Sequence, residues 1–240
     1  MGRDNQEENA VEVREEGGLP TELKDQFDLK DNMEGVTPRL PQIGIIHQGQ
    51  MFIFPDESQV KDFIGIMLDT NPINAWWEQS YDETGGGTPP DCYSMDGIIP
   101  DLNCEKPQAS TCRECPKNKF KSDGNRGKAC KNMKRVHILL EGEMLPHRLT
   151  LPPSNQKAID MYISLLTSKG DPYQLVWTKF KLKKAQNKDS IVYSEIAPEA
   201  SGYITDPAKA AFLKKMLVEF KSVMRGQDIA RTEFTADDNL

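Results

Sequence analysis

Five cysteines, all that the 240-residue chain contains, lie between residues 92 and 130. Two of them, Cys112 and Cys115, form a Cys-x-x-Cys motif. Two thiolates at this spacing can bind one metal ion, and a second pair from elsewhere in the segment would complete the tetrahedral four-cysteine site that structural zinc prefers. The cysteine pattern therefore predicts a zinc-binding insertion over residues 92–130, between two apolar segments.

A four-cysteine site leaves one of the five cysteines over. Cys92 and Cys130 lie at the two ends of the segment, so this pair would close the base of the insertion. We therefore expect Cys92, Cys112, Cys115 and Cys130 to be the zinc ligands, and Cys104 to be the spare. The spacing from Cys104 to Cys112 also leaves Cys104 open as a replacement for Cys92.

A loop closed by disulfides is the alternative explanation of this segment. The odd number of cysteines, the Cys-x-x-Cys motif and the lack of an apolar signal peptide over residues 1–16 favour a metal site instead. No stretch approaches the roughly 20 apolar residues of a membrane-spanning helix. We expect a soluble, cytoplasmic protein, located in the host cytoplasm if the source is a virus.

The charge of the chain is unevenly distributed. The net charge is -7, yet residues 113–135 carry nine basic and two acidic side chains, a local net charge of 9 - 2 = +7 that leaves -14 for the remainder. Because distribution matters more than the sum for binding a polyanion, the basic segment keeps nucleic acid among the expected partners.

The two ends of the chain are acidic and poor in large apolar residues. Residues 1–35 carry eleven acidic and four basic side chains, so this segment cannot bury enough apolar surface to offset the entropy of ordering. We expect a disordered acidic arm over residues 1–36 and a flexible tail, which leans acidic, over residues 227–240.

Between these ends, the sequence predicts an α+β, strand-rich body. A turn is expected at Asn71 and Pro72. One helix is expected to start with Ser154 as its N-cap and to cap one end of the sheet, and an amphipathic helix over residues 201–226 would be capped by Asp206. The expected strands cover residues 39–47, 51–54, 62–69 with a bulge at Gly65, 135–140, 144–151, 173–182 and 190–196.

Basic and aromatic residues are interleaved in the insertion and in two expected strands. Such segments suit phosphate contacts and base stacking. A solvated lysine surface and tryptophans packed in the core are the alternatives, and adjacent strand residues point to opposite faces. The candidate nucleic-acid-binding residues are Trp76, Trp77, Lys117, Lys119, Phe120, Lys121, Arg126, Lys128, Lys131, Lys134, Arg135, Trp177, Lys179 and Lys181.

Several segments together resemble the single-stranded-DNA-binding proteins of tailed bacteriophages, in which an OB-type barrel carries a zinc insertion. The matching segments are LPQIGII at 40–46, AWW at 75–77, PDCYS at 90–94, CRECPKN at 112–118, GKACK at 127–131 and LPPS at 151–154. The resemblance implies an OB-like single-strand-binding domain over residues 37–200. It departs from the family pattern at Cys104 and in a C-terminal tail that is less densely acidic.

By this resemblance, the chain would coat and protect single-stranded DNA during phage DNA replication and recombination, without reading sequence. Replication or recombination proteins would contact the acidic tail. No enzyme is expected, because the three histidines are scattered and the sequence lacks a phosphate-binding loop, a zinc-protease helix motif and a nucleophile elbow. The alternatives are a zinc-ribbon interaction module that docks on host transcription or replication machinery, and a metal-dependent nuclease.

Overall fold

The computed structural model describes residues 34–36, 38–46, 49–79, 83, 88–186 and 192–230. The chain divides into two units, residues 1–38 and residues 39–240, and all the strands and helices described below belong to the second. Most of the predicted acidic arm and the last ten residues of the predicted tail lie outside the described residues. No described helix is both long and apolar enough to cross a membrane.

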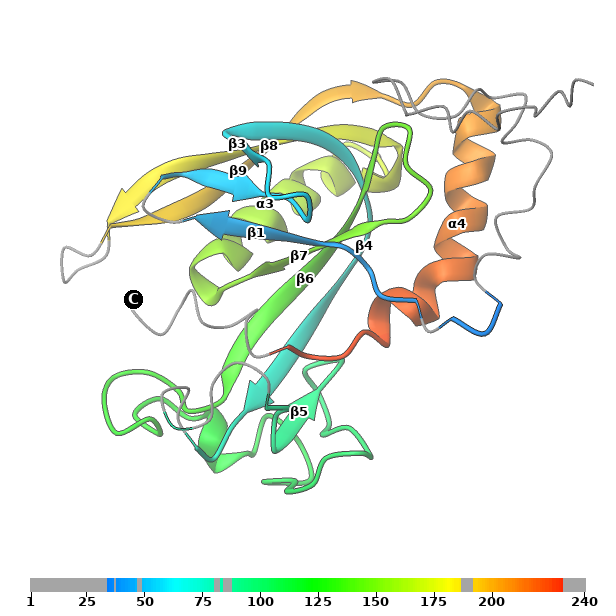
Figure 1. Ribbon diagram of the computed structural model, residues 1–240. Helices are drawn as coiled ribbons and strands as arrows, with labels where there is room; N and C mark the ends of the chain where they lie inside the picture. The colour runs from blue at the N-terminus through cyan, green and yellow to red at the C-terminus, as the bar shows by residue number, and fades with distance from the viewer. Residues whose placement is uncertain are drawn as a thin grey trace, which may run out of the picture. The chain divides into compact units, whose positions relative to one another are not determined.

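The described part of the chain forms one nine-stranded sheet in the order β3-β2-β1-β7-β6-β4-β8-β9, with β5 paired to β4 beside this path. All neighbouring strands are antiparallel except β1 and β7, which are parallel. The long strand β4 bends, and the sheet curls around helix α3 (Figure 1). The strands are β1 Gln42–Ile46, β2 Met51–Ile53, β3 Gln59–Val60, β4 Asp62–Trp76, β5 Cys92–Ser94, β6 Lys131–Leu140, β7 His147–Leu151, β8 Val176–Gln186 and β9 Val192–Tyr203.

Within the described residues, two α-helices pack on this sheet, as predicted: α3 over Pro153–Ser168 and α4 over Pro207–Arg225. Short 3-10 helices cover Pro116–Asn118 and Tyr173–Leu175. Asp206 caps α4 as expected, since its side chain accepts a hydrogen bond from the Ala208 N–H. The prediction of Ser154 as the α3 N-cap is wrong: extended Pro152 precedes the helix, and Pro153, which has no N–H to leave unpaired, takes the first position.

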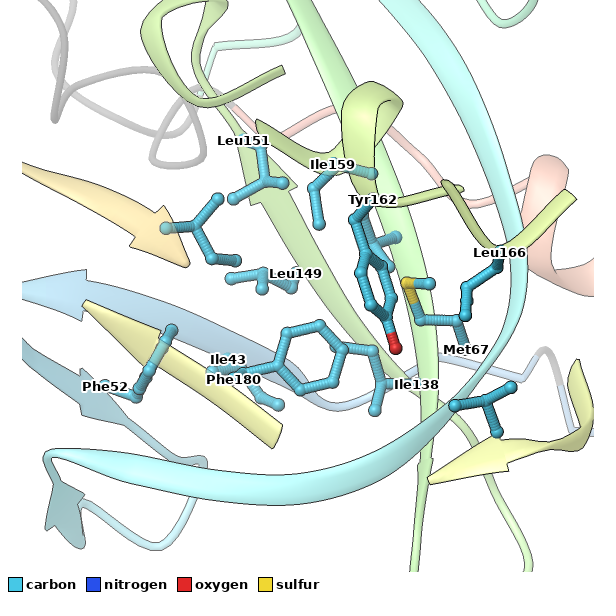
Figure 2. Close-up of a cluster of buried hydrophobic side chains, with 13 residues drawn as sticks. Ile43, Phe52, Met67, Ile138, Leu149, Leu151, Ile159, Tyr162, Leu166 and Phe180 are labelled. Atoms are coloured by element: carbon cyan, nitrogen blue, oxygen red, sulfur yellow. The ribbon is translucent and has the colours of Figure 1, made fainter. Parts of the chain in front are cut away.

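The sheet is covered on both faces, which gives two main hydrophobic clusters. Figure 2 shows the cluster between the inner face of the sheet and α3, where Phe52, Met67 and Phe180 meet Ile159 and Tyr162. The second cluster packs strand residues against α4. The period of two along β4 explains the division, because Ile66 and Leu68 belong to the α4 cluster and Met67 to the α3 cluster.

The α+β, strand-rich prediction is confirmed, but two local expectations on β4 are wrong. Asn71 and Pro72 do not form a turn, because β4 continues through them to Trp76. Pro72 pairs with Lys134 of β6 on one side only, since the residues of β4 that pair with β8 end at Ile66. The missing N–H of proline is tolerated at such a position. The irregularity in pairing lies between Met67 and Asp69 rather than at Gly65.

Gly65 has a different role from the predicted bulge. A Cβ at this position would lie 2.5 Å from Ile138 Cγ2, so glycine permits the close approach of β4 and β6. The curled sheet has two edges, β3 and β9, and in the described residues no pairing joins them. The fold is therefore a half-barrel of strands with a helix on each side of the sheet.

Candidate metal centre and nucleic-acid interface

The segment over residues 92–130 is anchored at both ends to the last residues of β4. Cys92 pairs with Trp76 through β5, and Lys131, the residue after Cys130, pairs with Ala75 through β6. The two cysteines that the sequence places at the base of the insertion therefore arrive at the same end of the sheet. The chain between them leaves the sheet and returns to it within a short distance.

Hydrogen bonds from the backbone and from the Asn118 side chain shape the segment around the Cys-x-x-Cys motif. Asn118 Nδ2 donates to the carbonyl of Cys112 at 2.8 Å, and the Asn118 N–H donates to the carbonyl of Cys115 at 3.1 Å. The N–H of Cys130 donates to the carbonyl of Lys117 at 2.8 Å, which brings the distant cysteine next to the motif.

All four predicted ligands line one small cavity. Cys92, Cys112, Cys115 and Cys130 surround a space of about 10 Å³ together with Trp76 and others. A space of this size takes about one water-sized species. Cys112, Cys115 and Cys130 are buried, and none of the five thiols forms a disulfide.

The thiols of the cavity influence one another electrostatically. Burial raises the pKa of Cys130 to about 12, and charge on Cys115, Cys112 and Cys92 contributes to that rise. Burial also raises the pKa of Cys92 to about 11, with Cys104 and Cys115 adding to the effect. A divalent cation would offset this mutual repulsion, so the donor set fits zinc in number and in kind.

The side chains as they stand do not form a finished metal site. Across the described ranges no group of three or more His, Cys, Asp or Glu side chains has the geometry to hold a metal ion. Cys104 does not line the cavity; its Sγ accepts from the Tyr93 N–H and donates to the Tyr93 carbonyl, both at 3.1 Å. Cys104 also lies beside Cys92, since a side-chain hydrogen bond to Cys104 contributes to the raised pKa of Cys92, so the choice between these two cysteines as the fourth ligand stays a prediction.

Two of the candidate nucleic-acid-binding residues are buried and are removed from the set. Trp76 is 6 % exposed and lines the cysteine cavity, with Lys117 Nζ 4.7 Å from the centroid of its ring. Arg135 is fully buried and donates to the carbonyls of Gln227 and Asp228, both at 2.7 Å. Neither side chain can reach a nucleic acid in this arrangement.

Four candidates gather in one groove of about 860 Å³. Phe120, Arg126 and Lys128 come from the insertion and Lys131 from the start of β6. The first turn of α3 and Tyr193 at the start of β9 also line this space. We call this space the basic groove. Its other lining residues are Asp123, Asn125, Gly127, Cys130, Asn132, Met133, Pro153, Ser154 and Gln156.

The aromatic and cationic groups of the basic groove lie close together. Phe120 is 76 % exposed, and Lys128 Nζ lies 5.2 Å from the centroid of its ring. Lys128 Nζ also donates to the side-chain oxygens of Asn118 at 3.1 Å and Asn132 at 2.9 Å, so this cation is held in place. The carboxylate of Asp123 accepts from the N–H groups of its own turn, at Asn125 and Gly127.

The remaining candidates lie outside the groove. Trp77 is partly buried and donates from Nε1 to the Thr88 carbonyl at 2.9 Å. Lys119 Nζ donates to the carbonyl of Arg113 at 2.6 Å, Lys121 forms part of a turn with φ of 69°, and Lys134 pairs with Asp160.

Trp177, Lys179 and Lys181 share one face of β8, as the alternation predicts. Lys179 pairs with Asp62 at 3.0 Å, and Lys181 pairs with Glu199. Trp177 packs against the α4 cluster, and Lys209 Nζ lies 4.3 Å from its ring centroid. The lysines of this strand face are therefore compensated by neighbouring carboxylates.

Tyr193 is an aromatic residue of the basic groove that was not among the candidates from the sequence. It follows a polar segment and carries no local motif, and only the pairing of β9 with β8 brings it to this place.

No family model matches the chain, and neither a curated protein nor a solved structure is similar to it.

Proposed function

We propose that the chain binds single-stranded DNA in the basic groove without sequence preference, and that a zinc ion held by Cys92, Cys112, Cys115 and Cys130 stabilises the wall that carries Phe120 and Arg126. The observation that carries the proposal is the groove itself. It combines Arg126, Lys128 and Lys131 with two aromatic side chains in a chain that is otherwise strongly acidic.

The chemistry of the groove suits a single strand. Lysine and arginine side chains displace counterions from the phosphate backbone, and this contribution to binding falls as salt rises. Exposed aromatic faces stack on unpaired bases of any identity, which a duplex does not offer. Phe120 and Tyr193 line the same groove as the three cations, so the bases and the backbone of one strand would both find partners there.

The metal would act structurally rather than chemically. Cys130 supplies one ligand and also lines the basic groove, so binding at the cysteine cavity and the shape of the groove are coupled through one residue. When bound, zinc would stabilise the folded insertion by the free energy of its coordination. In this proposal, the curled half-barrel corresponds to the OB-type barrel and residues 92–130 to its zinc-ribbon-like insertion.

The proposed role is to coat and protect single strands, with no catalysed reaction. The test measures the anisotropy of fluorescent single-stranded and duplex oligonucleotides across a salt series. We expect preference for the single strand and a linear fall of log K with log salt. Loss of the oligonucleotide itself would instead reveal a nuclease, and no binding to either would favour a protein-docking module.

A double substitution places the interaction in the groove. Arg126→Ala with Lys131→Ala should reduce the steepness of log K against log salt by about 0.7 for each phosphate that is no longer neutralised. Lys214→Ala, on the exposed surface of α4, removes a charge outside the groove and should leave the slope unchanged. Equal slopes for the double variant and the unmodified chain would move the binding surface elsewhere.

A further inference from the structure

The fifth cysteine of the chain lies beside the proposed zinc ligands. Cys104 Sγ contacts the backbone of Tyr93, the residue that follows Cys92, where it accepts from the N–H and donates to the carbonyl, both at 3.1 Å. A side-chain hydrogen bond also links Cys104 to Cys92. Since Cys92 lines the cysteine cavity and Cys104 does not, one thiol of the proposed ligand set has a second thiol as its neighbour outside the cavity.

Backbone hydrogen bonds hold these two cysteines on adjacent segments. The Lys106 N–H donates to the Asp91 carbonyl at 2.9 Å, and the Asp101 N–H donates to the Tyr93 carbonyl at 2.8 Å. The two cysteines therefore lie between two points at which their segments are bonded to each other. Segments joined in this way lie about 5 Å apart, and a disulfide joins Cα atoms about 4.4–6.8 Å apart. The backbone arrangement thus suits a disulfide between these two thiols.

Solvent reaches these two thiols more readily than the other three. Cys92 and Cys104 are partly exposed, whereas the remaining cysteines are buried. Cys104 is also flanked by two exposed residues, Asn103 and Glu105. The susceptibility of a cysteine to oxidants follows its exposure as well as its thiolate character. Because Cys92 faces the cavity and Cys104 does not, a dissolved oxidant would meet Cys104 first.

We propose that Cys92 and Cys104 form a modification site at which a low-molecular-weight disulfide, such as oxidised glutathione, converts the two thiols to one disulfide. The structure shows the reduced form, since none of the five thiols is paired. In a reducing compartment such disulfides are usually transient and redox-sensing. The pair contains one zinc ligand and one spare whichever of the two thiols is the fourth ligand, so the proposal does not depend on that choice.

The reaction consists of two thiol–disulfide exchanges. The Cys104 thiolate attacks one sulfur atom of oxidised glutathione, the S–S bond of the oxidant breaks, and one glutathione thiolate leaves. The Cys92 thiolate then attacks the Cys104 sulfur atom and expels the second glutathione thiolate. In sum, the two protein thiols lose two protons and two electrons to form one S–S bond, and the oxidant takes them up to become two thiols.

The disulfide would leave the cysteine cavity with three thiols in place of four. A tetrahedral zinc site needs four ligands, so oxidation should release the metal and loosen the insertion. Cys130 lines both the cysteine cavity and the basic groove, so the same change would reach the groove. This last consequence rests on the proposed function: oxidation would weaken the binding of single-stranded DNA, and a reductant would restore it.

The test is a peptide map of the full chain after exposure to oxidised glutathione. The protein is then denatured with a chelator, its free thiols are blocked with N-ethylmaleimide, and it is cleaved after glutamate. One product, residues 84–105, contains Cys92 and Cys104 and none of the other cysteines. We expect this peptide to be unlabelled and lighter by two hydrogen atoms, with labels kept on the other three cysteines. Treatment with dithiothreitol before blocking should restore both labels.

Two variants in the same loop serve as a matched pair. Cys104→Ser removes one thiol, so the peptide should keep a label or a glutathione on Cys92 and form no disulfide. Leu102→Ser changes a fully exposed side chain two positions away and keeps both thiols, so it should be oxidised as the unmodified chain is. Zinc release, followed with a metallochromic dye, should accompany oxidation in Leu102→Ser and be absent in Cys104→Ser.

Three results of the peptide map would overturn the proposal. Two labels on residues 84–105 of the oxidised chain would show that the pair does not react. Glutathione that stays on Cys104 would show that Cys92 cannot resolve the mixed disulfide, and loss of label from Cys112 and Cys115 instead would assign the disulfide to the Cys-x-x-Cys motif. The map contains no nucleic acid and does not require bound zinc, so its failure is distinguishable from failure of single-strand binding.

Discussion

Arg225 closes the last turn of α4 onto β4 through two hydrogen bonds to Asp69: Nε donates to Oδ2 at 2.7 Å, and Nη2 donates to Oδ1 at 2.9 Å. The carboxylate is nearly buried, whereas the arginine is partly exposed. The hydrogen bonds to Asp69 raise the pKa of Arg225. This pair fixes the helix against the middle of the longest strand.

Arg225→Ala should destabilise the fold, because it leaves the Asp69 carboxylate buried without its partner. We expect the free energy of unfolding to fall by about 2 kcal/mol, less than for a fully buried pair because solvent screens the exposed arginine. Urea unfolding measures the difference. Lys215→Ala removes the exposed pair with Glu219 at 3.9 Å and should cost less than about 0.5 kcal/mol. Equal losses in both variants would contradict the assigned role of the pair.

Serine substitutions should distinguish the cysteines that bind zinc from the spare cysteine. Cys112→Ser should lose zinc and expose residues 92–130 to proteolysis while the sheet stays folded, because the coordination free energy stabilises mainly the insertion. Cys104→Ser should keep one zinc per chain, since Cys104 does not line the cavity. Elemental analysis of protein purified without chelator measures both. Zinc retained in Cys112→Ser and lost in Cys104→Ser would reverse the assignment of spare and ligand.

The cysteine set has the strongest local signal in the sequence, a Cys-x-x-Cys motif and two flanking cysteines, and the structure brings these four to one cavity, while zinc binding itself stays a prediction. The basic segment over residues 113–135 predicts the nucleic-acid-binding residues less well. Arg135 belongs to it by composition, yet residues 227 and 228 return from the far end of the chain and cover it. Likewise, alternation places Trp76 and Trp77 on opposite faces without saying which face the insertion covers.

The fold shows the same contrast between features that local sequence patterns predict and features that depend on residues remote in sequence. Strands and helices follow from periodicity, as the pairing of β8 with β9 and the length of α4 illustrate. Asn71 and Pro72 predict a turn in isolation, but β6 pairs with both, and long-range pairing overrides the local preference. The place of Tyr193 in the basic groove likewise depends on residues remote in sequence.

Stability should depend on pH through His137. Burial lowers its pKa to about 4, against the opposing effects of the Asp69 charge and of backbone hydrogen bonds at Asp69 and Met224. The unfolded chain, with a histidine pKa near 6.5, therefore binds more protons than the folded chain between about pH 4 and 6.5. The contribution of this residue is complete above about pH 6.5 and is lost as the pH falls through that window.

His137→Leu tests this dependence, because leucine fills a buried site without a titratable group. Unfolding by urea at a series of pH values should show a shallower loss of stability between pH 6.5 and 4 in the variant, by up to about 3 kcal/mol at the lower end. The comparison uses the change across the window within each protein, so that a constant packing cost of leucine cancels. Parallel curves for the two proteins would show that another group governs the acid sensitivity.

Phe120 should contribute to single-strand affinity by stacking and not by charge. Its ring is largely exposed at the mouth of the basic groove, and Phe120→Ala removes one stacking surface, worth about 1–3 kcal/mol for each base. We expect single-strand binding to weaken by about tenfold or more while the slope of log K against log salt stays unchanged, because every cation of the groove is kept. Phe212→Ala, on the α4 surface, is the matched control and should bind normally. If Phe120→Ala binds as tightly as Phe212→Ala, the bases do not stack on this ring, and only the cations of the groove would hold the strand.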